Sequence, residues 1–178
     1  MVTAILKSGQ KVNIMKAVEA DAAALIAYMN QISRESDNLT FGPGELNITK
    51  KEEAHFIRSV NSQPNALFLV AVVENRIIGN LHFTGGNRPR TAHAGEFGMS
   101  VLREFWGQGL GSALLERLIV WAKGTGTIRK INLRVRTDNV GAIRLYHQTG
   151  FQVEGIITRE FKVKGQYYDL MSMGLKLD

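Results

Sequence analysis

Residues 106–112 read Trp-Gly-Gln-Gly-Leu-Gly-Ser, and an apolar pattern with helical spacing follows directly. Three glycines alternate with other residues at the point where a strand-like segment gives way to that helix. A backbone with so few side chains can turn its amides inward around an anion, and the positive end of the next helix would point at the same place. This glycine segment therefore predicts a binding site for a diphosphate group.

Two common phosphate-binding loops have a different spacing. A Walker loop needs Gly-Lys followed by Ser or Thr, and a dinucleotide-binding fingerprint needs Gly-x-Gly-x-x-Gly. The glycine segment reads Gly-x-Gly-x-Gly and carries no lysine. Both classes are therefore disfavoured. A flexible turn before a helix is the plainer alternative, but three glycines within five positions weaken it.

The composition is that of one globular domain. A chain of 178 residues can bury a core, and 44% hydrophobic with 21% charged residues is ordinary for such a domain. The absence of cysteine excludes disulfides, thiolate zinc sites and a cysteine nucleophile. The longest apolar run, residues 66–73, is too short to span a membrane, and no signal-peptide pattern opens the chain. We expect a single domain over residues 1–178, cytoplasmic and without a membrane partner.

The net charge of +6 is concentrated in the second part of the chain. Residues 1–102 hold ten basic and nine acidic side chains, whereas residues 103–178 hold twelve and seven. The basic residues are neither interleaved with aromatic residues nor gathered on one predicted helix, as nucleic-acid binding would favour. A phosphorylated small ligand near the glycine segment is the more economical explanation, and a nucleic-acid-binding protein is the less favoured one.

The remaining pattern predicts strands that surround a few helices. Helices are expected from the N-cap Asp21 to about Ser33, from the capping box at Thr49 and Glu52, over 112–123, and from the N-cap Asn139 to about Thr149. Local hairpins between strands indicate a mixed α/β domain with a mostly antiparallel sheet. The expected strands cover residues 11–18, 67–74, 76–84, 93–101, 130–136, 151–161 and 166–176.

A second motif lies downstream, where Asn139-Val140-Gly141-Ala142-Ile143-Arg144-Leu145-Tyr146 is followed by Gly150-Phe151. Together with the glycine segment, it closely resembles the GNAT superfamily of acyl-CoA-dependent N-acetyltransferases, from about Val12 to the C-terminus. That family carries Gln/Arg-x-x-Gly-x-Gly/Ala and, on a later helix, Asn-x-x-Ala-x-x-Leu-Tyr…Gly-Phe. Trp106 stands at the leading Gln/Arg position. The resemblance implies one domain with about seven strands splayed in the middle and about four flanking helices.

The resemblance also implies how acetyl-CoA, as the cosubstrate, would be held. The main chain at the end of strand 93–101 would pair with the pantetheine arm, whose two amides can mimic a neighbouring strand. For the side chains of Met99 and Val101, core packing is the plainer role. Asn139 is an N-cap on sequence grounds, and the family also places it near the cofactor. The implied cofactor-binding residues are Met99, Ser100, Val101, Trp106, Gly107, Gln108, Gly109, Leu110, Gly111, Ser112 and Asn139.

Two residues are expected to carry the chemistry. Tyr146 matches the family's general acid, and a phenol with a pKa of about 10 can supply a proton to a thiolate whose thiol has a pKa of about 8.5. Its plainer role is that of a core tyrosine. Glu96 is the candidate base, because Arg134 stands where some N-terminal amine acetyltransferases of the family have Glu. An acid in the apolar strand 93–101 needs a task or a partner, and an ion pair with Arg88, Arg90 or another base is the alternative.

These residues predict an N-acetyltransferase that moves the acetyl group of acetyl-CoA to a primary amine by direct attack in a ternary complex, without a metal. The acceptor is a small-molecule amine or a protein N-terminal amine; Glu35, Asp37 and Glu45 could attract a cationic one, although acids on a loop are commonly solvated. A non-catalytic acyl-CoA-binding or sensing module is the rival function, and Tyr146 argues against it. No nucleic-acid partner is expected, and a homodimer through the last strands or a helix face is left open.

Overall fold

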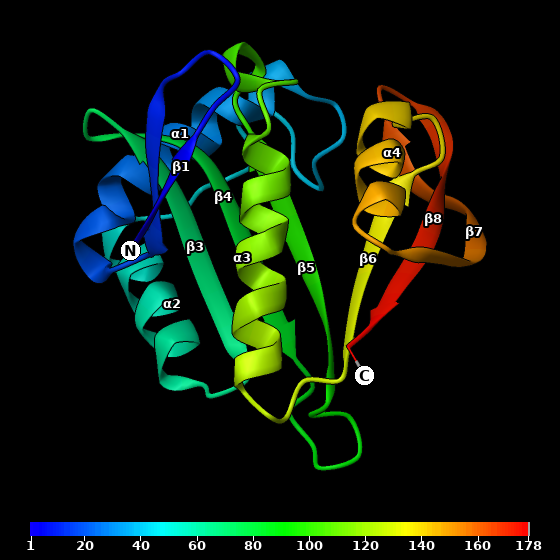
Figure 1. The fold of residues 1–178 in the computed structure, drawn as a ribbon. Helices are drawn as coiled ribbons and strands as arrows, with labels where there is room; N and C mark the ends of the chain where they lie inside the picture. Colours follow the sequence, from blue (N-terminus) through cyan, green and yellow to red (C-terminus); the bar gives the residue numbers. More distant parts are fainter. Residues whose placement is uncertain (178) are drawn as a thin grey trace.

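A single open sheet of eight strands organises the described part of the chain (Figure 1). The computed structural model describes residues 1–177. Neighbouring strands follow the order β1-β2-β3-β4-β5-β6-β8-β7. The strands are β1 (Val2–Ile5), β2 (Lys11–Lys16), β3 (Ala66–Val73), β4 (Arg76–Gly85), β5 (Ala94–Val101), β6 (Lys130–Arg136), β7 (Gln152–Val163) and β8 (Gln166–Lys176). The α-helices are α1 (Ala22–Glu35), α2 (Lys50–Ser62), α3 (Leu110–Gly124) and α4 (Val140–Gln148).

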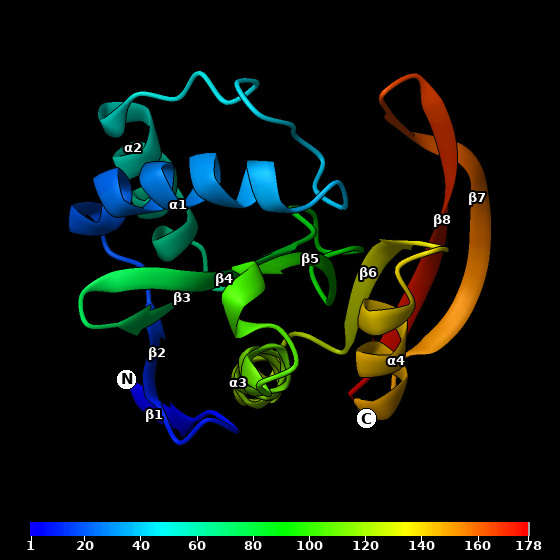
Figure 2. The same cartoon turned by 90° about the horizontal axis from the view of Figure 1, so that it is seen from above.

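The predicted fold class is confirmed, with one strand more than expected. The additional strand is β1, which has only four residues and pairs with β2. Its outer position leaves three of its four side chains exposed, so the alternation that identifies a half-buried strand is missing. The four predicted helices are all present, and α1 and α2 lie on one face of the sheet while α3 and α4 lie on the other (Figure 2).

The middle of the sheet is splayed, as the resemblance implies. β5 and β6 run parallel and pair only over Ala94–Glu96 and Lys130–Asn132. Beyond these three pairs the strands diverge, and their facing edges have no strand between them (Figure 1). β4 pairs with the other edge of β5 as far as Val101, and β8 pairs with the other edge of β6. The end of β5 therefore presents a free main-chain edge inside the sheet.

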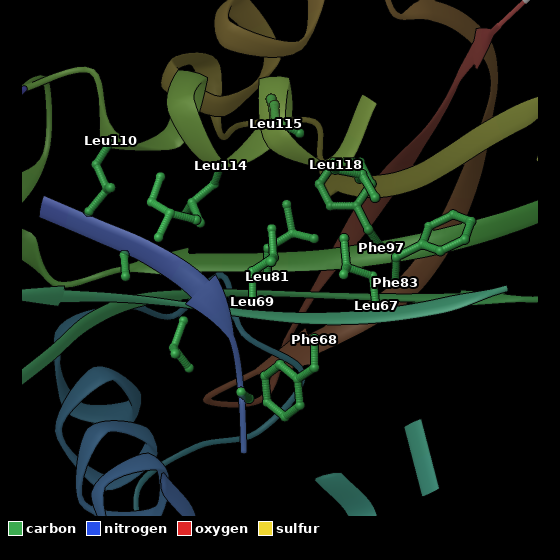
Figure 3. Close-up of a cluster of buried hydrophobic side chains, with 14 of the residues drawn as sticks. Leu67, Phe68, Leu69, Leu81, Phe83, Phe97, Leu110, Leu114, Leu115 and Leu118 are labelled. Atoms are coloured by element: carbon green, nitrogen blue, oxygen red, sulfur yellow. The ribbon is translucent and has the colours of Figure 1, made fainter. Parts of the chain in front are cut away.

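The core under α3 fixes the position of the glycine segment. Leu67 and Leu69 of β3 alternate with Phe68, so the two leucines face α3 while Phe68 points to the opposite face (Figure 3). Burial of each such side chain contributes about 1.5–3 kcal/mol. The α3 side of this core comprises the buried residues Leu110, Leu114, Leu115 and Leu118 (Figure 3). Helix α3 is thus anchored from its first residue onward.

Candidate active site at the splay of the sheet

The glycines of the segment serve two structural purposes. Gly107 and Gly109 have φ angles of 70° and 91°, in the left-handed region that favours glycine. A Cβ at either position would meet nothing within 4 Å, so backbone conformation is the constraint there. At Gly111, a Cβ would lie 2.9 Å from Leu145 Cδ2, so this glycine lets α3 approach α4 closely. The turn and the helix contact together bring the two sequence motifs into one site.

Helix α3 begins without a side-chain cap. Its N-cap is Gly109, and the first hydrogen bond that closes the helix runs from the Ala113 amide to the Gly109 carbonyl, at 3.1 Å. The helix starts at Leu110, two residues before the predicted start. The amides of its first turn, in Leu110, Gly111 and Ser112, are therefore left for an acceptor outside the helix. Three such amides at the positive end of a helix suit a diphosphate group.

The larger side chains of the glycine segment brace the loop from within. Trp106 donates its indole Nε1 hydrogen to the Val101 carbonyl at 2.6 Å, which ties the loop to the end of β5. The Gln108 side chain donates from Nε2 to the Glu104 carbonyl at 2.9 Å, and the main-chain carbonyl of Gln108 accepts the Lys7 amide at 3.1 Å. The Trp106 amide is also bonded, to the Arg103 carbonyl at 3.0 Å, so of these two residues the Gln108 amide is the group that remains for a ligand.

The end of β5 also uses its side chains inside the protein. The Ser100 hydroxyl donates to Asn80 Oδ1 at 2.8 Å and lies 2.8 Å from the hydroxyl of Tyr28, on α1. Met99 and Val101 are partly buried against the core, in agreement with the packing role expected for their side chains. An extended ligand would therefore contact the main-chain edge of β5, which is the part that a peptide-like arm can pair with, apart from the Val101 carbonyl that already accepts from Trp106.

Tyr146 is buried beside this edge. The side chain is 8% exposed, and its ring packs at 5.9 Å, centroid to centroid, against both Phe97 of β5 and Phe151. Burial raises the pKa of Tyr146 to about 12. The phenol is therefore protonated at neutral pH. It is also more than a thousandfold weaker as an acid than an ordinary thiol with a pKa of about 8.5.

Glu96 lies on the opposite face of β5. Phe97 faces α4, and successive strand residues alternate, so Glu96 shares the face of Ser100 and Tyr28. Its Oε1 accepts from Arg134 Nε at 3.0 Å, and both side chains are nearly half exposed. The expectation of an acid in apolar surroundings is wrong, because this carboxylate reaches solvent. The ion pair given as the alternative is present, and the base is Arg134.

The two predicted catalytic residues thus approach the splay from opposite faces. Tyr146 comes from the side of α3 and α4, and Glu96 from the side of α1 and α2. The opening between β5 and β6 is the place where groups bound on the two faces can meet. Asn139 caps α4 as predicted, since its Oδ1 accepts the Ala142 amide at 3.3 Å, and α4 in turn positions Tyr146.

A buried arginine next to the site was not singled out from the sequence. Arg136, on β6, is 8% exposed and donates to both carboxylate oxygens of Asp138, at 3.0 and 2.6 Å. It also donates to the Asp37 carbonyl at 2.9 Å and stacks 3.6 Å from the ring centre of Tyr168. The pattern of β6 contained the signal, because its alternation places Asn132, Arg134 and Arg136 on one face.

The three acids proposed to attract a cationic amine are all bonded within the chain. Glu35 accepts the Arg103 amide at 2.7 Å, Asp37 accepts from Lys164 Nζ at 2.9 Å, and Glu45 accepts the Gly42 amide at 2.8 Å. These bonds tie the end of α1 to Arg103 and the segment between α1 and α2 to Lys164 and to itself. Within residues 1–177, no cluster of three or more His, Asp or Glu side chains could hold a metal ion. No helix in that range is long and apolar enough to cross a membrane.

Comparison with known proteins identifies the class that this fold and site define. The chain matches the acetyltransferase (GNAT) family over residues 28–151, which is well over half of its length. It belongs to this family and is an acyl-CoA-dependent N-acyltransferase.

Named relatives and solved structures extend the match. The L-amino acid N-acetyltransferase AaaT of Escherichia coli strain K12 is 31% identical over 111 residues, covering 62% of this chain and 68% of that protein. A spermidine N(1)-acetyltransferase of Vibrio cholerae is 28% identical over 113 residues, covering 64% of this chain but only 58% of that protein. A GNAT-family acetyltransferase of Streptococcus pneumoniae superimposes with a TM-score of 0.91 at 32% identity, over 94% of this chain and 99% of that one. A Salmonella typhimurium acetyltransferase solved with its cofactor acetyl-CoA has a TM-score of 0.82 at 23% identity, over 94% of each chain.

Proposed function

We propose that this chain transfers the acetyl group of acetyl-CoA to a primary amine by direct attack in a ternary complex. One observation carries the proposal. The left-handed glycine turn leads into an uncapped helix N-terminus and lies next to the free edge of β5. The first feature fits a diphosphate and the second fits the amides of a pantetheine arm. Acetyl-CoA contains both groups and supplies an activated acetyl thioester.

The residues of the proposed cofactor site act mainly through their main chain. The amides of Gly107–Ser112 hold the diphosphate, and the edge at Met99–Val101 pairs with the pantetheine arm. An amide of the same edge stabilises the oxyanion that forms when the amine attacks. Acetyl-CoA would be held on one side of the opening in the sheet and the amine on the other. This positioning supplies much of the rate acceleration.

Tyr146 is proposed to act on the sulfur that leaves. A phenol whose pKa is raised to about 12 is fully protonated at neutral pH, so it can always donate a hydrogen bond. Complete proton transfer to a thiolate is uphill for so weak an acid. The phenol therefore keeps its proton and donates a hydrogen bond to the sulfur. This hydrogen bond strengthens as negative charge develops on the sulfur, which selectively stabilises the transition state.

Glu96 is proposed to receive the acceptor on the other face. A lysine-type amine has a pKa of about 10.4 and an α-amino group a pKa of about 7.7–8.0, so either arrives at pH 7 mostly as an ammonium ion, which must lose a proton before it attacks. The carboxylate binds this ion and takes its first proton directly or through water, and the second proton, which the nitrogen loses after attack, passes to solvent or to the departing thiolate. The two relatives are named for an L-amino acid and for spermidine, both of which present primary amines. That chemistry supports an amine acceptor, on a small molecule or at a protein N-terminus.

Calorimetry with acetyl-CoA, followed by an assay of CoA release with a panel of amines, tests the proposal. The protein should bind acetyl-CoA and release CoA only when an amine is present. Binding without release would indicate a sensing module, and failure to bind either CoA or acetyl-CoA would end the proposal.

Two matched glycine variants sharpen this test. Gly109→Ala forces a Cβ into a left-handed conformation at the diphosphate turn, and we expect about tenfold weaker acetyl-CoA binding. Gly165→Ala imposes the same strain in the turn between β7 and β8, where φ is 84° and the space is equally open. The control should leave acetyl-CoA binding unchanged, and equal losses in the two variants would contradict the placement of the diphosphate.

A further inference from the structure

The face of the splay that carries Glu96 has a hollow of about 440 Å³ at its closed end. The residues that line it include Thr84, Arg90, His93, Glu96 and Asn132. Glu96 pairs in register with Thr84 on β4 and with Asn132 on β6, so the three side chains project from adjacent strands on one face. The volume lies in the lower part of the range of small-molecule sites.

The charges around this hollow are of both signs. Glu96 is the one acid among its lining residues, and Arg90 lines it as well. Arg134 follows the lining residue Asn132 by two positions on β6; it lies 3.0 Å from Glu96 and 3.6 Å from Glu160. Asn132 adds a buried Oδ1 that has no hydrogen-bond donor among residues 1–177. A ligand group with N–H donors would satisfy this oxygen, which is costly to leave unpaired.

We propose that the acceptor is an amino-acid-like zwitterion, in which a carboxylate lies on the carbon next to the amine. This proposal rests on the proposed acetyl transfer and narrows its acceptor. The ammonium lies against Glu96 and Asn132, and the carboxylate lies against Arg134. The Glu96–Arg134 ion pair and the zwitterion then form two antiparallel dipoles, so each charge has an opposite neighbour and the ion pair stays intact.

An acceptor with positive charges alone fits this hollow less well. Its ammonium could reach Glu96 only beside the guanidinium of Arg134, which would repel it. A peptide N-terminus has an amide where the zwitterion has its carboxylate, and it would leave Arg134 without a new partner.

The test compares acceptors that differ only in the acid group. CoA release is measured with acetyl-CoA and twenty L-amino acids, their carboxamides, their decarboxylated amines, and spermidine. We expect the best amino acid to exceed its carboxamide and its decarboxylated amine about tenfold in kcat/KM. Equal or higher values for the carboxamides, the decarboxylated amines or spermidine overturn the proposal while the acetyl transfer stands. CoA release that needs no amine would contradict both the zwitterionic acceptor and the proposed acetyl transfer.

Variants of Arg134 provide an independent readout. Arg134→Gln should raise KM about tenfold for the amino acid and should not raise KM for its carboxamide, whose ammonium loses a repelling neighbour, and Arg134→Lys should restore part of the difference. Arg58→Gln removes an exposed Arg–Glu pair of α2, with Glu19, and should change neither. Calorimetry with acetyl-CoA confirms that each variant is folded. Parallel changes for the acid and the amide would overturn the role of Arg134, and the acceptor panel on the unaltered protein decides the substrate class by itself.

Discussion

At the scale of single residues, Tyr146 offers the most direct check of the chemistry. Tyr146→Phe keeps the ring that packs against Phe97 and Phe151 and removes only the hydroxyl. Because that hydroxyl is proposed to contact the sulfur as charge develops on it, we expect kcat to fall by about a hundredfold or more. Acetyl-CoA affinity, measured by calorimetry, should stay within about a factor of two.

The same variant distinguishes catalysis from packing. A structural role would lower the melting temperature and weaken acetyl-CoA binding together, with kcat little affected in the molecules that remain folded. Unchanged turnover from pH 6 to pH 10 would remove Tyr146 from the mechanism. Leu145→Ala, one residue earlier on α4, is a fitting control because it perturbs the contact with α3 without touching the phenol.

The two buried tyrosines also predict how stability depends on pH. Burial raises the pKa of Tyr146 to about 12 and also raises that of Tyr28, against the opposing hydrogen bond to Ser100. The folded state then keeps protons that the unfolded chain loses near pH 10. Each tyrosine's contribution is complete below pH 10 and falls by about 1.4 kcal/mol per pH unit as the pH rises toward 12.

Urea unfolding at pH 9, 10 and 11 measures this loss. The variant with both Tyr28→Phe and Tyr146→Phe should show a flatter dependence over the same range. If the unaltered protein and the double variant lose stability in parallel, other groups control the alkaline transition.

At the scale of elements, the caps show which parts of the site could be predicted from the sequence. Asn139 and the capping box at Thr49 and Glu52 were predictable because a cap acts within four residues, and both are present. The start of α3 was predicted two residues late, since glycines at 109 and 111 have low helix propensity. The packing of Leu110 and Gly111 against the rest of the protein outweighs the low helix propensity of glycine, so α3 begins two residues earlier.

The pairing of Glu96 with Arg134 lay beyond local pattern. The two residues are 38 positions apart, and only the parallel register of β5 and β6 brings them together. Alternation along β6 correctly placed Arg134 on the polar face, but the sequence does not reveal which acid that face meets. The splay itself was predictable from the family resemblance and not from strand propensity, because both diverging segments read as ordinary strands.

Loss of the α4 cap should affect both stability and turnover. Asn139→Ala removes the acceptor for the Ala142 amide and should lower the free energy of unfolding by about 1 kcal/mol. Helix α4 has only nine residues, so fraying at its start also loosens Tyr146, and we expect kcat to fall. Thr49→Ala removes the corresponding cap of α2 and should cost similar stability with kcat unchanged. Equal effects of the two variants on kcat would show that α4 does not position the phenol.

At the scale of the whole molecule, contacts on the face that carries Glu96 link the two halves of the splayed sheet. The segment after α1 and the tip of the β7–β8 hairpin approach each other there (Figure 2). Asp37 joins them, because its carboxylate accepts from Lys164 Nζ at 2.9 Å and its carbonyl accepts from Arg136. The opening between β5 and β6 on this face is therefore bounded by a link between segments 127 residues apart.

Breaking this link should change acceptor binding and little else. Lys164 and Asp37 are well exposed, so Lys164→Ala should leave the melting temperature and acetyl-CoA affinity almost unchanged. Without the link, the segments that bound the opening must be ordered when the acceptor binds. This cost should raise KM for the acceptor about threefold. Salt screens exposed pairs, so the unaltered protein in 0.5 M salt should approach the variant, whereas Lys162→Ala, on the same hairpin, should retain the salt effect. If KM for the acceptor is the same in the unaltered protein and in Lys164→Ala at low salt, the link between Asp37 and Lys164 does not help to shape the opening between β5 and β6.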